Sequence, residues 1–268
     1  MRKFPLLGAM ALGAALLVGC ASLGKPPATP GDARGAPAYG YTPIDPLPVV
    51  VVARTKPPTN AALLAALPDE TMRLAIGEVS GKGAIAYGPA KIGYAGSSYV
   101  AILDYVKFDT RSLGFKTSPA IDAQPAKLSL LPDDAPVTPD AIVPTYVGVG
   151  LRLTASITVN QGSVDLGNLL AIGVAAEAKR AAGTLVIQTL GITGPGISSA
   201  LPLPSEINTT TIQNALIALG TIKAKLYDNA TTITPQVVGV YNNVGGGQDV
   251  VNGFISAILE HPLRLEVP

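Results

Sequence analysis

The chain has only one histidine and one cysteine, His261 and Cys20, and this scarcity limits the chemistry its side chains can perform. A single cysteine cannot form an intrachain disulfide bond or a cysteine-rich zinc site. A single histidine cannot build a multi-histidine metal centre. A Ser-His-Asp triad would have to use His261, but no G-x-S-x-G motif supplies its serine. We therefore expect His261, at the end of a predicted helix, to complement the helix dipole.

The carboxylates are few and offer little for metal binding or acid–base chemistry. Asp133, Asp134 and Asp140 form the only local cluster, in a proline-rich stretch without EF-hand spacing, so a solvated loop is expected. Asp104 and Asp109 lie five residues apart on one predicted strand. They therefore point to opposite faces and cannot act as a local acid–base pair. The sequence predicts no metal and no cofactor.

Two glycine-containing segments were weighed as sites and are better explained as turns. Ser80-Gly81-Lys82 has the composition of a turn, although it leaves a Ser-Lys dyad formally open. Gly245-Gly246-Gly247 precedes a predicted helix and could hold an anion through backbone N–H groups. No Lys-Ser/Thr follows it, so the P-loop pattern fails. The chain is thus expected not to be an enzyme.

The most specific motif lies at the N-terminus. The basic start Met1-Arg2-Lys3 is followed by an uncharged apolar run over residues 4–18, which is too short for a spanning helix and typical of a secretory signal. The run ends in Leu17-Val18-Gly19-Cys20. This pattern resembles the lipobox of bacterial lipoproteins, which reads aliphatic, small or aliphatic, Gly or Ala, then Cys.

The lipoprotein resemblance implies a cleaved signal peptide over residues 1–19 and a lipid attachment site at Cys20. Leu17, Val18 and Gly19 would be recognised by signal peptidase II, and Cys20 would carry diacylglyceryl and an N-linked acyl chain such as palmitate. Several chains would hold the protein to the membrane permanently, since each buried CH₂ contributes about 0.8 kcal/mol. In such lipoproteins an Asp directly after the lipidated Cys often marks retention in the inner membrane. Because Ala21 stands at this position, the resemblance favours the outer membrane, with the body facing the periplasm or the cell surface.

Composition and charge limit the class of protein further. With 48% apolar and 14% charged residues, the chain can bury enough surface to fold. Its length of 268 residues allows one large domain or two small ones. A formal net charge of +1 argues against nucleic acid as a partner, because nucleic-acid binders usually carry a clustered basic excess.

The mature chain divides into a tether and a body. Prolines and glycines alternate over residues 20–48, which predicts a flexible tether after the lipidated cysteine. The body spans residues 49–268. It allows a β-rich lobe over 49–143 and an α/β lobe over 144–268, with the proline-rich stretch between them forming either a long ordered loop or the join of two lobes.

Alternation of apolar and polar residues predicts several strands. The clearest covers 147–159, with one apolar and one polar face, and a second covers 99–109, where Asp104 interrupts the apolar face. Shorter strands are expected near 49–52, 72–79, 84–93, 184–193, 232–241 and 263–267.

Three helices are expected in the C-terminal half. One runs from a cap at Asp165 to about residue 182. A second follows Asn208, where Ile212, Leu219 and other apolar residues form a helical stripe, although Thr221–Tyr227 could instead be a strand. The third covers 249–260. We therefore predict an α+β fold, with a mixed or antiparallel sheet and about three helices packed on one face.

Three functions remain open from the sequence. The favoured one is a lipid-anchored, non-enzymatic envelope protein that acts as a scaffold or assembly partner and binds another envelope protein. The alternative is a small-ligand binder or enzyme at the outer membrane. The third is a subunit of an oligomeric outer-membrane pore, whose hairpin arms would be the strands at 99–109 and 147–159. Each is long enough to cross a membrane, because a tilted membrane-spanning strand needs about 9–11 residues.

Overall fold

The computed structural model describes residues 40–53, 57–88, 91–118, 127–131, 136–244 and 247–267. The chain divides into two units, residues 1–31 and residues 32–268, and every described residue belongs to the second. The predicted signal peptide, the lipobox residues Leu17, Val18 and Gly19, and Cys20 therefore lie outside the described residues.

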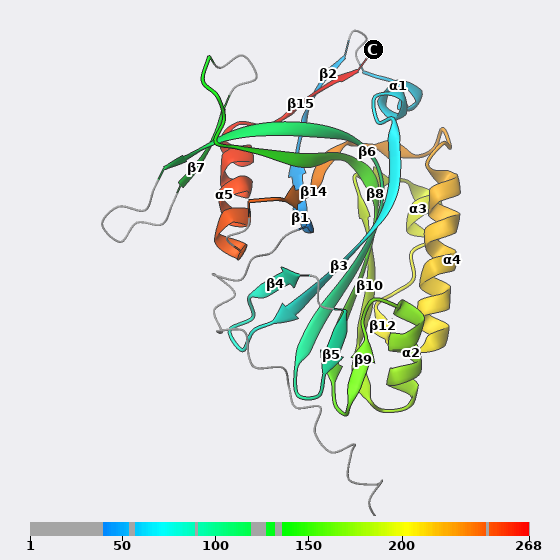
Figure 1. The fold of residues 1–268 in the computed structure, drawn as a ribbon. Coiled ribbons are helices and arrows are strands. Elements are labelled where there is room, and N and C mark those ends of the chain that lie inside the picture. Colours follow the sequence, from blue (N-terminus) through cyan, green and yellow to red (C-terminus); the bar gives the residue numbers. More distant parts are fainter. Residues whose placement is uncertain are drawn as a thin grey trace, which may run out of the picture. The chain divides into compact units, whose positions relative to one another are not determined.

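Strands dominate the described part of the chain (Figure 1). The strands are β1 (Gly40–Pro48), β2 (Val50–Ala53), β3 (Asp69–Val79), β4 (Ile85–Gly88), β5 (Ile92–Tyr94), β6 (Ser98–Ser118), β7 (Lys127–Leu130), β8 (Ala141–Val159), β9 (Ser163–Asp165), β10 (Ala181–Leu190), β11 (Ile192–Thr193), β12 (Ser205–Glu206), β13 (Thr232–Ile233), β14 (Gln236–Asn242) and β15 (Arg264–Val267). The helices are α1 (Asn60–Ala65), α2 (Leu169–Glu177), α3 (Pro195–Ser198), α4 (Thr209–Lys225) and α5 (Gly247–Glu260).

The main sheet has nine strands and is antiparallel throughout. Its central path is β1-β14-β8-β6-β3-β4, and β10, β12 and β7 pair outside this path. β6 and β8 pair without a register shift from Ser98 opposite Thr158 to Phe115 opposite Ala141. The two strands predicted most clearly are therefore direct neighbours, and both are longer than their sequence patterns indicated.

β8 bends sharply, and its glycines make the bend possible. A Cβ at Gly150 would lie 1.9 Å from the Tyr105 carbonyl oxygen of β6, closer than any side chain can approach. A Cβ at Gly148 would likewise lie 2.3 Å from the Lys107 carbonyl oxygen. Only glycine can bring the two backbones together in this way. Beyond this point β6 and β8 form an arm that ends beside β7 and α5 (Figure 1).

The predicted α+β class is wrong, because the structure is mostly β, with 50% strand and 23% helix. The helices also do not form one layer. α2 packs against α4 and β10, whereas α5 packs against β1, β4 and β7 (Figure 1). β6 continues past residue 109 to Ser118, and β8 begins before residue 147, at Ala141; this extra strand length moves the fold out of the predicted class.

The helix boundaries follow local capping. Asn208 caps α4 as predicted, since its side chain accepts a hydrogen bond from Thr211 N–H at 2.8 Å in a reciprocal capping box. α4 continues to Lys225, so the alternative strand over residues 221–227 does not form. α2 begins after Asn168 and not at Asp165, because the Asn168 side chain accepts from two backbone N–H groups.

The end of the predicted tether forms a strand. β1 occupies residues 40–48, where prolines and glycines suggested flexible chain. Its apolar residues Ile44 and Leu47 are buried, and its register against β14 shifts between Pro43 and Leu47, where prolines are tolerated. The predicted strands near 49–52 and 263–267 are β2 and β15, which pair with each other in parallel.

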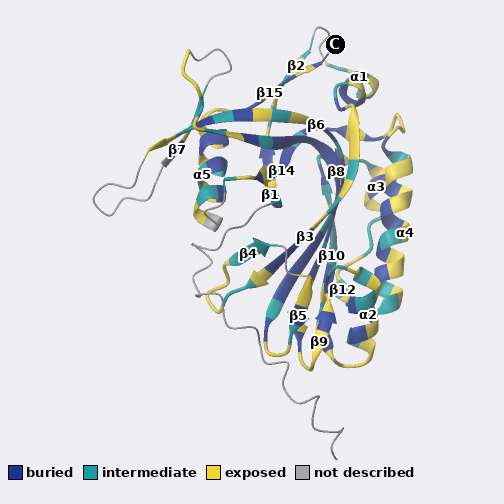
Figure 2. Cartoon of the chain, viewed as in Figure 1, coloured by how far each residue is buried: buried dark blue, intermediate teal, exposed yellow. Residues whose placement is uncertain are grey.

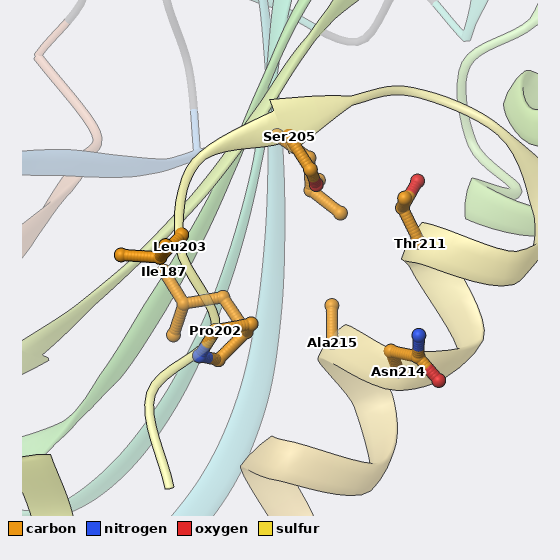
Figure 3. A pocket seen from close by; sticks show the side chains of 8 residues that line it. Ile187, Pro202, Leu203, Ser205, Thr211, Asn214 and Ala215 are labelled. Carbon is orange, nitrogen blue, oxygen red and sulfur yellow. The ribbon is translucent and has the colours of Figure 1, made fainter. Parts of the chain in front are cut away.

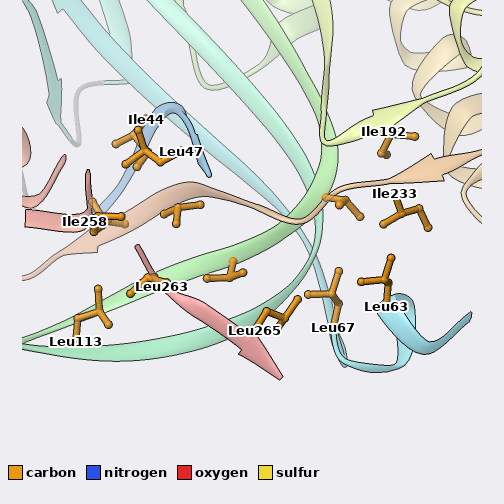
Figure 4. Packing of buried hydrophobic residues seen from close by; sticks show 14 of the residues in the cluster. Ile44, Leu47, Leu63, Leu67, Leu113, Ile192, Ile233, Ile258, Leu263 and Leu265 are labelled. Carbon is orange, nitrogen blue, oxygen red and sulfur yellow. The ribbon is translucent and has the colours of Figure 1, made fainter. Parts of the chain in front are cut away.

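Two large apolar clusters hold these elements together. One joins β1, the β6–β8 arm, α1, α5 and β15; the members labelled in Figure 4 are Ile44, Leu47, Leu63, Leu67, Leu113, Ile192, Ile233, Ile258, Leu263 and Leu265. The second lies between strands β6, β8 and β10 and helices α2 and α4, and it includes Tyr99, Ile157, Ile172 and Ile212. In a third cluster, Val106 and Phe108 of β6 pack against Tyr146, Leu190 and Val238 of neighbouring strands. No described helix is long and apolar enough to cross a membrane.

Candidate functional site

A cavity of about 640 Å³ opens between the sheet, β1, β4 and α5. Its floor consists of side chains from β6, β8 and β10. Its other lining residues come from β1, from β4 and the turn that leads into it, and from α5. The lining residues are Thr42, Pro43, Ile44, Asp45, Gly83, Ala84, Ile85, Tyr87, Val100, Ile102, Arg152, Thr154, Ser156, Gln188, Val251, Asn252 and Ile255.

The polar face of β8 supplies much of this floor. Arg152, Thr154 and Ser156 alternate along the strand and therefore share one face. Their exposure rises along the strand, from buried Arg152 through half-buried Thr154 to exposed Ser156. The cavity thus runs from a closed end at Arg152 to an open rim. Figure 2 shows how much of the central sheet is buried.

A buried ion pair forms the closed end. Arg152 Nε donates to Asp104 Oδ1 at 2.8 Å, and Arg152 Nη2 donates to Asp104 Oδ2 at 2.7 Å. Asp104 is fully buried and Arg152 is 3% exposed. Burial by itself lowers the pKa of Arg152, but the hydrogen bonds and charge of Asp104 outweigh it and raise the pKa above its usual value. The pair is therefore charged and mutually neutralised.

Two irregularities in the sheet supply further acceptors for Arg152. The β14–β8 register shifts between Val237 and Gly239, and the Val238 carbonyl at this shift accepts from Arg152 Nη2 at 2.9 Å. The β1–β14 register shifts near Ile44, whose carbonyl accepts from Arg152 Nη1 at 2.8 Å. Because a bulge takes backbone groups out of the ladder, both carbonyls are free to bind the guanidinium.

Tyr41 completes the network from β1. Its hydroxyl donates to Asp104 Oδ2 at 2.5 Å. The ring occupies space beside Gly239, where a Cβ would lie 2.5 Å from a ring carbon. Burial, together with the charge of Asp104, raises the pKa of Tyr41 well above its usual value, so the hydroxyl stays protonated and keeps donating.

The walls of the cavity combine uncharged polar groups with apolar side chains. Thr154, Ser156 and Gln188 provide the uncharged polar groups, and Ile85 of β4 with Val251 and Ile255 of α5 provides aliphatic side chains. Tyr87 of β4 also lines the cavity, and burial raises its pKa to about 12. Its phenol is therefore a neutral donor at physiological pH.

A smaller groove of about 120 Å³ lies between β10, the segment that contains β12, and α4. Figure 3 shows Ile187, Pro202 and Leu203 facing Thr211, Asn214 and Ala215 of α4 across it. Leu203 is 85% exposed. The groove contains no charged side chain and no ion pair among its lining residues. It offers apolar contact area but little directional recognition.

Most of the residues that the sequence singled out, including His261, Gly81, Lys82 and Asp140, are not among the described residues that line the cavity. His261 is exposed just after the end of α5, and its backbone N–H bonds to the Ala257 carbonyl. Gly81 and Lys82 form a turn, as predicted. Asp140 is exposed and pairs with Lys116 at 2.6 Å. Hydrogen bonds from Lys116 and Thr117 lower the Asp140 pKa.

Several other sequence candidates cannot be placed. Asp133, Asp134, Gly245 and Gly246 lie outside the described residues, as does Cys20. Within the described ranges, no group of three or more His, Cys, Asp and Glu side chains is arranged to hold a metal ion.

Sequence reasoning missed the residues at the closed end of the cavity. Asp104 was noted only as an exception on an apolar face, and Arg152 only as one member of a polar face. The available signal was a charged residue in the middle of each of two long strands, with opposite signs. A prediction that these two strands pair in the observed register would have placed the two charges opposite each other, as they are in the sheet.

Comparisons with protein-family models, with curated proteins and with solved structures give no match to this chain.

Proposed function

We propose that this chain is a lipid-anchored, non-enzymatic protein of the cell envelope that binds a small ligand in the cavity between the sheet, β1, β4 and α5. The observation that carries the proposal is the cavity itself. Its volume of about 640 Å³ lies within the roughly 300–1,000 Å³ typical of small-molecule sites. It combines apolar walls with a few convergent polar groups, which is the usual composition of such sites.

The state of the charged groups supports binding rather than catalysis. Asp104 accepts three hydrogen bonds, from Arg152 and Tyr41, and is fully buried. A general base must reach the proton it abstracts, and Asp104 is held by its own partners instead. Arg152 is likewise held by Asp104 and by two carbonyls. The network gives the cavity a rigid floor.

The proposal is tested by mapping ligand contacts on the full chain in lipid nanodiscs. Methyl NMR signals of Ile102 and Val251 would be followed during a screen of neutral, anionic and cationic fragments. Ile255→Trp fills the cavity from α5, and Ser256→Trp is the matched control, because Ser256 is exposed on the same helix and does not line the cavity.

We expect some fragments to shift these methyl signals in the wild type and in Ser256→Trp, and to have no effect on them in Ile255→Trp. The proposal fails if no fragment of any charge shifts the cavity methyls, or if Ile255→Trp leaves the response unchanged.

The anchor is the second part of the proposal, and the lipobox supports it. Acyl chains on Cys20 would hold the protein at the outer membrane, with the body facing the periplasm or the cell surface. Cys20→Ser is expected to move the protein from the membrane fraction to the soluble fraction and to abolish labelling by radioactive palmitate. Unchanged labelling in this variant would contradict the assigned attachment site.

A second candidate function is the scaffold or assembly role. The observation that favours it is a set of exposed apolar side chains on α2 and α4, where Leu170, Val174 and Ile217 are 43%, 53% and 67% exposed. Envelope crosslinking should capture one stoichiometric protein with the wild type and lose it with Ile217→Lys. Capture that does not depend on Ile217 would argue against this surface.

A further inference from the structure

We infer that the cavity selects an uncharged amphiphile, a molecule that joins a hydroxyl- or amide-bearing polar group to an apolar group. The inference rests on the proposed function, because it specifies the ligand class of the same cavity. Three features of the lining carry it: the balance of charge, the set of donors and acceptors, and the aliphatic surface.

The charges of the lining disfavour an anionic ligand. Arg152 and Asp45 are the only formally charged residues among the described residues that line the cavity. The Arg152 charge is neutralised by the buried carboxylate of Asp104 at 2.7 Å. Asp45 is exposed and adds a negative charge to the lining. An anion would meet this carboxylate and, among the described lining residues, no unpaired cation, and like-charge contact weakens binding.

A cationic ligand is also disfavoured at the closed end. The Asp104 carboxylate accepts three hydrogen bonds and has no solvent exposure. Arg152 lines the cavity there, whereas Asp104 is not among the described lining residues. A cation placed at this end would therefore approach Arg152 without reaching the carboxylate. Asp45 alone, which is exposed, would attract it only weakly because solvent screens exposed charges.

The remaining polar groups suit uncharged hydroxyls or amides. Arg152 carries five N–H hydrogens, of which Nε uses one, Nη2 two and Nη1 one on protein acceptors. Thr154 and Ser156 add hydroxyls on the same strand face, and Gln188 adds an amide. The two hydroxyls and the amide can both donate and accept hydrogen bonds, whereas the Arg152 guanidinium can only donate.

The lining also provides aliphatic surface. Val251 and Ile255 come from α5 and Ile85 from β4, while Val100 and Ile102 of β6 pair with Ser156 and Thr154 of β8. Val251 is buried, while Ile255 and Ile85 are half-buried. A ligand that contacts both kinds of group must have one polar and one apolar part. Burying its apolar part contributes about 25 cal/mol per Å² of surface removed from water.

The inference is tested with three water-soluble probes that share a phenyl ring: phenyl β-glucoside, phenyl phosphate and phenyltrimethylammonium. Their affinities for the full chain in nanodiscs are measured by the shifts of the Ile102 and Val251 methyl signals. We expect phenyl β-glucoside to bind at least about tenfold more tightly than either charged probe. Thr154→Val should weaken it several-fold, whereas Thr158→Val should not, because Thr158 lies on the same strand face outside the lining.

A charge added to the rim provides an independent check. Ser156→Lys should raise the affinity for phenyl phosphate about tenfold and reverse the preference, while the matched variant Thr158→Lys should leave the preference unchanged. Tighter binding of either charged probe to the wild type would overturn the inference but leave the proposed function standing. If none of the probes shifts the cavity methyls while fragments in the earlier screen do, the ligand class is wrong. If no compound does so in either experiment, both proposals fail.

Discussion

Asp104 and Arg152 lie directly opposite each other on β6 and β8 and are joined by two parallel hydrogen bonds inside the sheet. The pair connects more than these two strands. Arg152 also binds the Val238 carbonyl of β14 and the Ile44 carbonyl of β1, and Tyr41 of β1 binds Asp104. Four strands therefore meet at one neutralised ion pair, which fixes the closed end of the cavity.

Removing one partner of this pair should be strongly destabilising. Asp104→Asn keeps the shape of the side chain but leaves the buried Arg152 charge uncompensated, so we expect the free energy of unfolding to fall by about 3–5 kcal/mol. Urea denaturation followed by circular dichroism measures the change. Asp140→Asn is the control, because it removes an exposed ion pair with Lys116 and should shift the midpoint far less.

The apolar double variant Asp104→Leu/Arg152→Met separates loss of charge from loss of packing. A buried ion pair can often be replaced by apolar residues of similar volume at little cost. We expect this variant to be more stable than Asp104→Asn. If it is less stable, the damage does not come from the uncompensated charge.

Tyr41→Phe should destabilise the protein near neutral pH by about 1.5–3 kcal/mol, the contribution of a hydrogen bond to a charged group. Because the folded-state pKa of Tyr41 is raised, the unfolded chain loses its proton first as the pH rises above about 10. The stability of the wild type then falls by about 1.4 kcal/mol per pH unit from this group. The difference between wild type and variant should shrink accordingly.

Urea midpoints of both proteins between pH 7 and 11 check this expectation. The difference should be constant up to about pH 9 and narrow above pH 10. A difference that is independent of pH throughout, or that widens in alkali, would show that the Tyr41 hydroxyl does not interact with Asp104 as described.

Gly150 is expected to be intolerant of any side chain. Its Cβ in Gly150→Ala would lie 1.9 Å from the Tyr105 carbonyl oxygen, so β6 and β8 would have to separate, at a cost of at least about 1–3 kcal/mol. Gly220→Ala is the matched control. Its Cβ would enter open space on α4, and the change should stabilise the protein by about 0.4–1 kcal/mol. Thermal unfolding midpoints that move in the same direction for both variants would contradict the account of the bend.

The cap of α4 gives a further prediction. Asn208→Ala removes the acceptor for the Thr211 N–H and should lower the free energy of unfolding by about 1 kcal/mol. Asn208→Asp retains the acceptor and should restore most of the stability. Hydrogen exchange in the first turn of α4 would report the effect locally; equal exchange rates in all three proteins would show that the cap contributes nothing.

Much of the local structure could be predicted from residue patterns. The alternation over 147–159, the stripe from Ile212 to Ile222 and the Asn208 cap each reflect neighbouring residues, and each is found in the structure. The lengths of β6 and β8 could not be predicted, because Thr110, Arg111 and Ser112 break the apolar pattern while backbone pairing continues across them. The fold class was wrong for this reason.

The cavity could not be predicted, because it depends on contacts between distant segments. A polar strand face predicts exposure to water, and nothing local shows that β1 and α5 cover that face between Arg152 and Ser156. β1 itself lies in a stretch rich in proline, which favours flexible chain unless a partner strand such as β14 supplies hydrogen bonds. The pairing of Asp104 with Arg152 likewise depends on which strands are neighbours.

Native mass spectrometry of the full chain isolated from its own envelope tests the central claim most directly. The wild type should carry a non-covalent small molecule that Ser256→Trp retains and Ile255→Trp loses, since only the latter fills the cavity. The covalent anchor is common to all three proteins and cancels in the comparison. Identical spectra for the wild type and Ile255→Trp would contradict the assignment of the cavity as a ligand site.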